Sequence, residues 1–87
     1  MSKPNIMNLP ADYALVLQQI RDDGEDDIIS LSESLNLKQS RIKHIVKALK
    51  GKGLLLMKTS YGNVWLQLTR KGERMATYIW PERLYVS

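Results

Sequence analysis

Two short helical stripes of apolar residues, separated by a join of about three residues, constrain the fold of this chain more than any other feature. The stripes predict one helix over about 28–35, which Asp26 or Asp27 would cap, and a second over about 38–50. Asn36 tolerates the left-handed backbone that a tight join requires. Two helices joined this closely are typical of a helix-turn-helix unit. The predicted buried positions are Ile28, Leu31 and Leu35, followed by Ile42, Ile45, Val46 and Leu49.

The flanking segments complete a recognisable order of elements. Residues 10–22 carry another amphipathic stripe and end before Gly24. Residues 54–59 and 64–69 are short apolar runs joined by a turn that contains Gly and Asn, which predicts a β-hairpin. Thr69 is placed to cap a last helix. We therefore predict an α+β, mainly α, winged helix-turn-helix with a three-helix core, a two-stranded β-hairpin wing and a C-terminal helix.

The same pattern divides the chain into three parts. Residues 1–9 are expected to form a flexible N-terminal arm, residues 10–80 the winged helix-turn-helix domain, and residues 81–87 a short C-terminal tail. No apolar run reaches the roughly 18 residues of a membrane span, and the first residues carry no export signal. We therefore expect a cytoplasmic protein that does not associate with membranes.

Composition argues against catalysis and against metal binding. The chain has 87 residues, no cysteine and one histidine, His44. A disulfide framework, a thiol nucleophile and a metal site built from soft ligands are therefore excluded. His44 also stands among basic residues, with no Ser/His/Asp grouping suggested. We predict that the protein is not an enzyme and uses no cofactor or metal.

Charge is distributed unevenly along the chain. Residues 12–33 hold seven acidic residues and one basic residue, whereas residues 36–72 hold nine basic residues and no acidic one. At 100° per residue, the basic side chains of the second helix-turn-helix helix lie opposite its apolar stripe, so they form a face. Such a face is typical of a surface that meets a polyanion. A charged face on a small helix is also what ordinary solvated surface looks like.

The helix-turn-helix segment resembles two families of bacterial and archaeal regulators. "LSESLNLKQSRIKHIVKALKGKGLL" and "LTRKGERMA" are similar to the core of the arsenic-repressor (ArsR-like) and multiple-antibiotic-resistance (MarR-like) regulators. The resemblance spans about residues 28–76. It implies a sequence-specific double-stranded DNA-binding transcription regulator. Two features depart from it: the wing tip is uncharged, and the long terminal helices that dimerise the MarR-like proteins are missing. The matching positions are Leu31, Ser32, Leu35, Asn36, Leu37, Gln39, Ser40, Gly53, Leu54, Leu55 and Leu68 to Ala76.

If the helix over 38–50 enters a DNA major groove, its position predicts which residues contact the DNA. Its N-terminal half would then approach base edges, and flanking cations would meet phosphates. We expect dimerisation through the helix over 10–22, the last helix or the tail, because one small module rarely gives enough specificity. Any small-molecule effector is unknown. The predicted base-contact residues are Gln39, Ser40, Arg41, Lys43 and His44. The predicted backbone-contact residues are Lys38, Lys47, Lys50, Lys58, Tyr61, Arg70 and Lys71.

A second hypothesis is a protein–protein interaction module, an adaptor in a transcription or replication assembly. Winged-helix domains serve that purpose too, and a fold does not fix a function. The acidic segment over residues 22–27 and the uncharged wing tip favour it. RNA binding is a third alternative. Binding to duplex DNA that weakens with salt separates the first hypothesis from the second.

Overall fold

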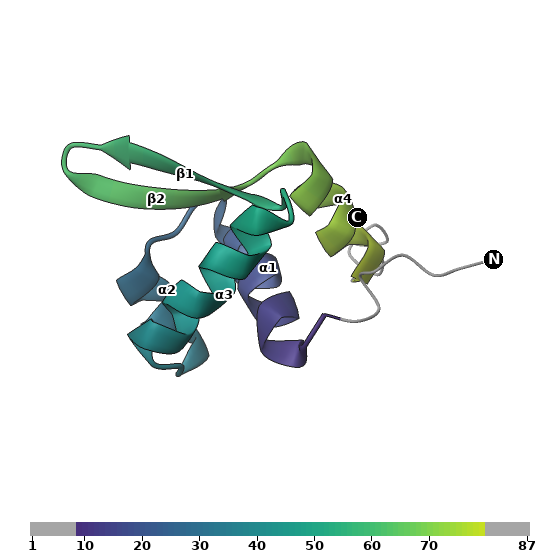
Figure 1. Cartoon of the computed structure of the whole chain (residues 1–87), viewed down its shortest axis with the longest axis horizontal. Coiled ribbons are helices and arrows are strands. Elements are labelled where there is room, and N and C mark those ends of the chain that lie inside the picture. Colours follow the sequence, from purple (N-terminus) through teal and green to yellow (C-terminus); the bar gives the residue numbers. More distant parts are fainter. Residues whose placement is uncertain (1–8, 80–87) are drawn as a thin grey trace.

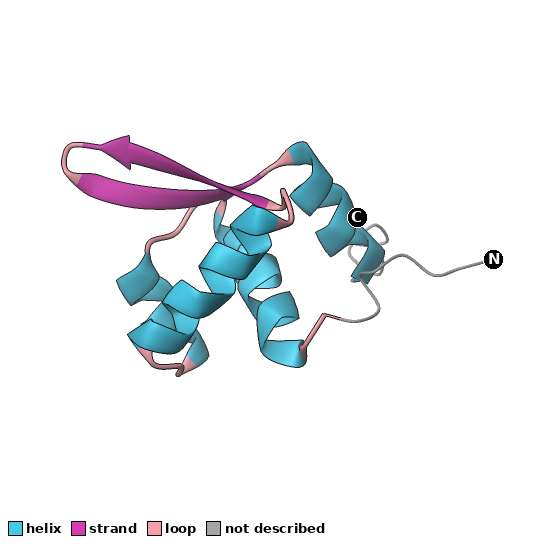
Figure 2. Ribbon diagram, viewed as in Figure 1, coloured by secondary structure: helices cyan, strands magenta, loops and turns pink. Residues whose placement is uncertain are grey.

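The computed structural model describes residues 9–79, which form four helices and one β-hairpin (Figures 1 and 2). The predicted order and type of the elements are confirmed, and so is the α+β, mainly α, winged helix-turn-helix fold. The predicted arm and tail, apart from Leu9, lie outside the described residues, and Leu9 itself packs against the core. The elements are α1 (Ala11–Asp23), α2 (Ile28–Leu35), α3 (Gln39–Gly51), β1 (Leu55–Ser60), β2 (Asn63–Leu68) and α4 (Arg70–Ile79).

The core lies where α1, α2, α3 and the base of the hairpin meet. All the predicted stripe positions of α3 are buried, and α2 buries Leu31 fully while Ile28 and Leu35 pack against the core from its edge. Each fully buried aliphatic side chain stabilises the fold by about 1.5–3 kcal/mol relative to an exposed one. The buried cluster consists of Val16, Leu17, Ile20, Leu31, Ile42, Ile45, Val46, Leu49, Leu54, Leu55 and Leu66.

The turn between α2 and α3 is held by local hydrogen bonds. Asn36 adopts the predicted left-handed conformation, with φ 56° and ψ 44°. The Ser32 hydroxyl donates to the Leu37 carbonyl oxygen, and the Leu37 N–H donates to the Ser32 carbonyl oxygen at 3.1 Å. At the other end of α2, Asp27 is the cap, because its carboxylate accepts from the Ser30 N–H at 2.7 Å. The short turn therefore fixes where α3 begins.

The hairpin extends from the core as the wing. Antiparallel pairing runs from Leu55 opposite Leu68 to Ser60 opposite Asn63. Only Tyr61 and Gly62 remain in the turn, and both have positive φ, 52° and 80°. This backbone is typical of the two-residue hairpin turn whose twist matches that of the strands. Figure 1 shows the hairpin reaching beyond the three-helix core on the side away from α4.

One residue between α1 and α2 pairs with the wing, a contact that the sequence analysis did not predict. The Asp26 N–H donates to the Leu66 carbonyl oxygen at 3.0 Å, and the Leu66 N–H donates to the Asp26 carbonyl oxygen at 2.7 Å. Beside it, the Gln67 side-chain amide donates to the Glu25 carboxylate at 2.9 Å. These bonds attach the loop between α1 and α2 to β2.

The start of α4 closes the base of the hairpin. The Thr69 hydroxyl accepts from the Gly72 N–H at 3.0 Å, which confirms its predicted capping role, and it donates to the Gly53 carbonyl oxygen at 2.6 Å. The Thr69 N–H donates to the Leu54 carbonyl oxygen at 3.0 Å. Gly72 is buried, and a Cβ atom there would collide with that same carbonyl. The Thr-x-x-Gly sequence is therefore a packing motif.

Candidate nucleic-acid interface

α3 turns its apolar stripe to the core and its polar side chains to solvent. It packs against α1, α2 and β1 (Figure 1), and all four stripe residues are at most 3% exposed. No acidic residue stands in the helix. Every predicted contact residue on or next to α3 is exposed: Lys38, Gln39, Ser40, Arg41, Lys43, His44, Lys47 and Lys50. We call these eight residues the α3 face.

The start of α3 is suited to an anion. Lys38 is the N-cap, and its side chain makes no capping hydrogen bond. The first turn contains no carboxylate that would offset the partial positive charge at the N-terminus of a helix. Lys50 stands in the last turn, where a cation offsets the negative end of the helix dipole. The helix dipole therefore favours an anion at the end of α3 that is predicted to approach base edges.

Arg41 forms the single ion pair among the described residues. Its Nη2 lies 2.7 Å and its Nε 2.8 Å from Oδ2 of Asp12, in the first turn of α1. Its Cζ also lies 5.6 Å from the centroid of the Tyr13 ring. The same ring meets His44 edge-on, with centroids 6.5 Å apart and planes at 76°. Two predicted base-contact residues therefore lie against α1.

The sequence analysis missed this contact with α1. It counted Asp12 only as part of the acidic segment and Tyr13 only as part of the apolar stripe. The i, i+3 spacing of Arg41 and His44, which places both on one side of α3, is the signal that could have indicated a shared neighbour. The acidic loop over 22–27 forms no ion pair with the α3 face, within the part of the chain that the structure describes.

The lysines on the other side of the α3 face have no such partner. Lys43, Lys47 and Lys50 are exposed, and the structure shows no ion pair for any of them with another described residue. Their ammonium groups are compact charges on flexible stems, which suits contacts with phosphate more than a fixed hydrogen-bonding geometry. The α3 face therefore has a constrained side at Arg41 and His44 and an unconstrained side at the lysines.

The predicted wing contacts lie on the hairpin beyond the core. Lys58 is exposed on β1 and pairs across the hairpin with Trp65. Tyr61 is fully exposed at the tip of the wing. Both are held on strands or their turn, so their positions depend on the register of the hairpin.

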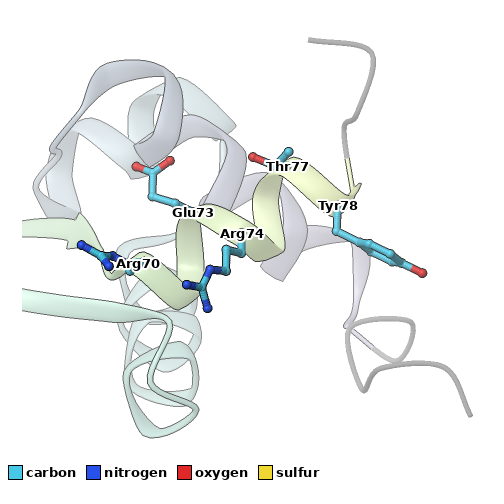
Figure 3. A pocket seen from close by; sticks show the side chains of 5 residues that line it. All are labelled: Arg70, Glu73, Arg74, Thr77 and Tyr78. Atoms are coloured by element: carbon cyan, nitrogen blue, oxygen red, sulfur yellow. The ribbon is translucent and has the colours of Figure 1, made fainter. Parts of the chain in front are cut away.

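The two predicted contacts on α4 have different surroundings. Lys71 is joined to the end of α3, because its Nζ donates to the Lys52 carbonyl oxygen at 3.1 Å. Arg70 instead lines a shallow pocket of about 400 Å³ on α4 (Figure 3). The structure therefore brings Lys71 close to α3 and places Arg70 with the other pocket residues, Glu73, Arg74, Thr77 and Tyr78.

The described residues contain neither a metal-binding cluster nor a membrane-spanning helix. No group of three or more His, Cys, Asp or Glu side chains is arranged to hold a metal ion in the part of the chain that the structure covers. None of the described helices is long and apolar enough to cross a membrane.

Comparison with solved structures gives clear matches to one kind of protein. BpsR from Bordetella bronchiseptica, whose DNA binding is regulated by 6-hydroxynicotinic acid, superposes with a TM-score of 0.80 and 22% identity. A MarR family protein from Bacillus stearothermophilus gives 0.81 and 21%, and a transcriptional regulator from Thermotoga maritima gives 0.78 and 26%. The chain has a MarR-like winged-helix fold.

The likeness covers most of this chain and a smaller share of the other proteins. The three alignments cover 91%, 93% and 91% of this chain but only 58%, 60% and 57% of the respective solved chains. This chain thus spans less than two thirds of the length of the MarR-like proteins it resembles. No protein-family model matches the sequence, and no curated protein matches it.

Proposed function

We propose that this MarR-like chain binds double-stranded DNA sequence-specifically through α3 and regulates transcription in the cytoplasm. One observation carries the proposal: the second helix of the helix-turn-helix exposes a face with five cations and no carboxylate of its own. α3 has 13 residues, so it is about 20 Å long, and a helix of that size fits the roughly 12 Å wide major groove. The regulators among the similar solved structures support this function.

The proposed contacts divide by chemistry. In the N-terminal half of α3, Arg and Lys donate to guanine O6 and N7, and Gln39 pairs with adenine N6 and N7; Ser40 and His44 complete the base contacts there. The remaining cations neutralise phosphates, which sets affinity without reading sequence. The proposed phosphate contacts are Lys38, Lys47 and Lys50 on α3, Lys58 on the wing, and Arg70 and Lys71 on α4, with Tyr61 contacting a sugar or the minor groove.

Selection from a pool of random duplexes tests the sequence preference. The enriched site is then used to compare Lys47→Ala with Arg41→Ala by fluorescence anisotropy. Lys47→Ala should weaken binding to all duplexes alike, whereas Arg41→Ala should also lose about 1–3 kcal/mol of discrimination at one base pair. Arg74→Ala, which removes one charge from α4, is the control. Equal losses for Lys47→Ala and Arg41→Ala on every sequence would contradict the assignment of base contacts.

We further propose that the protein acts as a homodimer. One helix in one major groove reads few base pairs, and dimers of helix-turn-helix proteins read two half-sites about one helical turn apart. The selected site should then be a palindrome. Light scattering with and without that duplex tests the oligomeric state, and a monomer at high micromolar concentration in both conditions would contradict it.

The adaptor hypothesis remains the second candidate. It is favoured by the uncharged wing tip and by three exposed acidic residues, of which Asp22 and Asp23 end α1 and Glu25 lies in the loop that follows. Absence of duplex binding at low salt, in a protein whose circular dichroism shows the expected helix content, would support it over DNA binding.

A further inference from the structure

The contact between Arg41 and Asp12 leaves part of the guanidinium free. The Nε–H of Arg41 donates to Oδ2 of Asp12 at 2.8 Å, and Nη2 lies 2.7 Å from the same oxygen in an ion pair. A guanidinium has five N–H donors in a fixed plane, so three of them remain: both on Nη1 and the second on Nη2. The Arg41 side chain as a whole is 43% exposed, so the contact with Asp12 does not bury it.

Tyr13 restricts the same group in a second way. The Arg41 Cζ lies 5.6 Å from the centroid of the Tyr13 ring, within the range of a cation–π contact. Asp12 holds one edge of the guanidinium while the ring lies beside it, so both its position and its orientation are constrained. Residues of α1 thus constrain the one arginine among the predicted base contacts.

We propose that Asp12 is a specificity-determining residue of the DNA interface. This inference rests on the proposed function of the α3 face. Asp12 acts through Arg41: it cancels the charge that Arg41 would present to phosphates, and it orients the free Nη1 and Nη2 donors toward a base edge. Tyr13 is the positioning residue that holds the plane of the guanidinium.

The physical argument separates the two kinds of DNA contact. Affinity for phosphates follows net charge, and the pair of Arg41 and Asp12 is neutral as a whole, so its contact with a phosphate releases few counterions. Recognition of guanine requires two N–H donors in a fixed geometry, which the outer edge of the paired guanidinium still offers. Asp12 therefore lowers binding to arbitrary sequences more than it lowers binding to a site with guanine at the right position.

Asp12→Asn tests this role while keeping the size of the side chain. The variant frees the charge of Arg41, so binding to a random duplex should strengthen about 2- to 5-fold, the range expected for an exposed ion pair. The slope of log Kobs against log salt should steepen by about 0.9, because one more phosphate is neutralised. The ratio of affinities for the selected site and the random duplex should fall.

Two controls distinguish a contact through Arg41 from a simple change of net charge. Glu33→Gln removes one negative charge from the exposed side of α2, and Glu33 forms no ion pair with Arg41. Asp12→Asn in an Arg41→Ala background removes the Asp12 charge when its partner is absent. We expect the ratio of affinities for the selected site and the random duplex to stay unchanged in both controls.

The outcomes separate this inference from the proposed function. If the wild-type protein binds duplex DNA but Asp12→Asn behaves as Glu33→Gln does, the role of Asp12 is wrong and DNA binding stands. The same conclusion follows if Asp12→Asn acts equally with and without Arg41. If the wild-type protein binds no duplex at low salt, both the proposed function and this inference fail.

Discussion

Asp26 buries its carboxyl group between α1, α2 and the wing. The side chain is 8% exposed, and its Oδ2 has no hydrogen-bond partner among the described residues. Burial is the largest of the causes that raise the pKa of Asp26 from its usual 3.8 to about 7; a hydrogen bond with Asp23 and the negative charges of Asp23 and Asp27 contribute the rest. The folded protein therefore holds a proton on Asp26 at pH values where the unfolded chain has lost it.

The sign of the resulting pH dependence follows from linkage. Between about pH 4 and pH 7 the folded state binds more protons at Asp26 than the unfolded state, so the contribution of Asp26 to stability falls as pH rises. Asp26→Asn cannot ionise, so it should remove this loss and stabilise the fold at pH 8 by about 1–3 kcal/mol, the order of the penalty for a buried charge that is only partly compensated. Urea denaturation of both proteins at several pH values from 5 to 8 measures the difference. A constant difference across this range would contradict the role given to Asp26.

Gly72 makes a second residue-scale prediction. The Leu54 carbonyl oxygen occupies the space that a Cβ atom would need, and as a backbone atom it cannot move aside as the end of a flexible side chain could. Gly72→Ala should therefore destabilise the fold by about 2–4 kcal/mol, as overpacking in a core does. Gly51→Ala is the matched control, because Gly51 lies in α3 with open space around it. This variant should be slightly more stable than the wild-type protein, since alanine favours a helix over glycine. Thermal unfolding measures both, and equal stability of the two variants would contradict the packing role.

The range of an interaction along the chain decided which residue roles were predictable. The predicted roles of Asp27, Asn36 and Thr69 involve backbone groups at most three residues away or the residue's own φ and ψ angles, so local chemistry predicted them. Arg41 and Asp12 are 29 residues apart, and their contact depends on how α1 packs against α3. Sequence patterns indicate that both helices form and which side chains share a face, but they do not identify the residue of another helix that a face meets.

The wing is the element whose details differ most from the predicted ones. A four-residue connection from Ser60 to Asn63 was expected, since Ser and Asn are common in turns. The structure instead pairs Ser60 with Asn63 and leaves a two-residue turn. The Asp26 pairing with Leu66 was not predicted either, because a single paired residue produces no alternating pattern. The hairpin itself was predictable because period-2 alternation needs only its own sequence.

Tyr61 provides the prediction at this scale. A fully exposed tyrosine with φ 52° is unfavourable at a turn that prefers Asn before Gly. Tyr61→Asn should therefore stabilise the fold by about 1 kcal/mol. It should also weaken duplex binding about 5-fold if the tyrosine makes one contact of about 1 kcal/mol with DNA. Thermal unfolding and anisotropy measure the two effects, and unchanged DNA affinity would remove Tyr61 from the interface.

At the scale of the whole molecule, the chain separates its charges around a shared core. α1 buries Val16, Leu17 and Ile20 in that core and places Asp12 beside the α3 face. The separation of an acidic and a basic segment was predictable, because it is a property of the sequence. Which carboxylate faces the α3 face was not, since that depends on the packing of α1 against α3.

The dependence of duplex binding on salt tests the central proposal, that the α3 face binds DNA, most directly. For the wild-type protein, log Kobs should fall linearly with log salt with a slope of about −3 to −5 per protomer, since up to six proposed cations meet phosphates. Lys47→Ala should make the slope shallower by about 0.9, and Arg74→Ala should leave it unchanged. Absence of duplex binding at about 50 mM salt, or a slope that Lys47→Ala does not alter, would contradict the proposal.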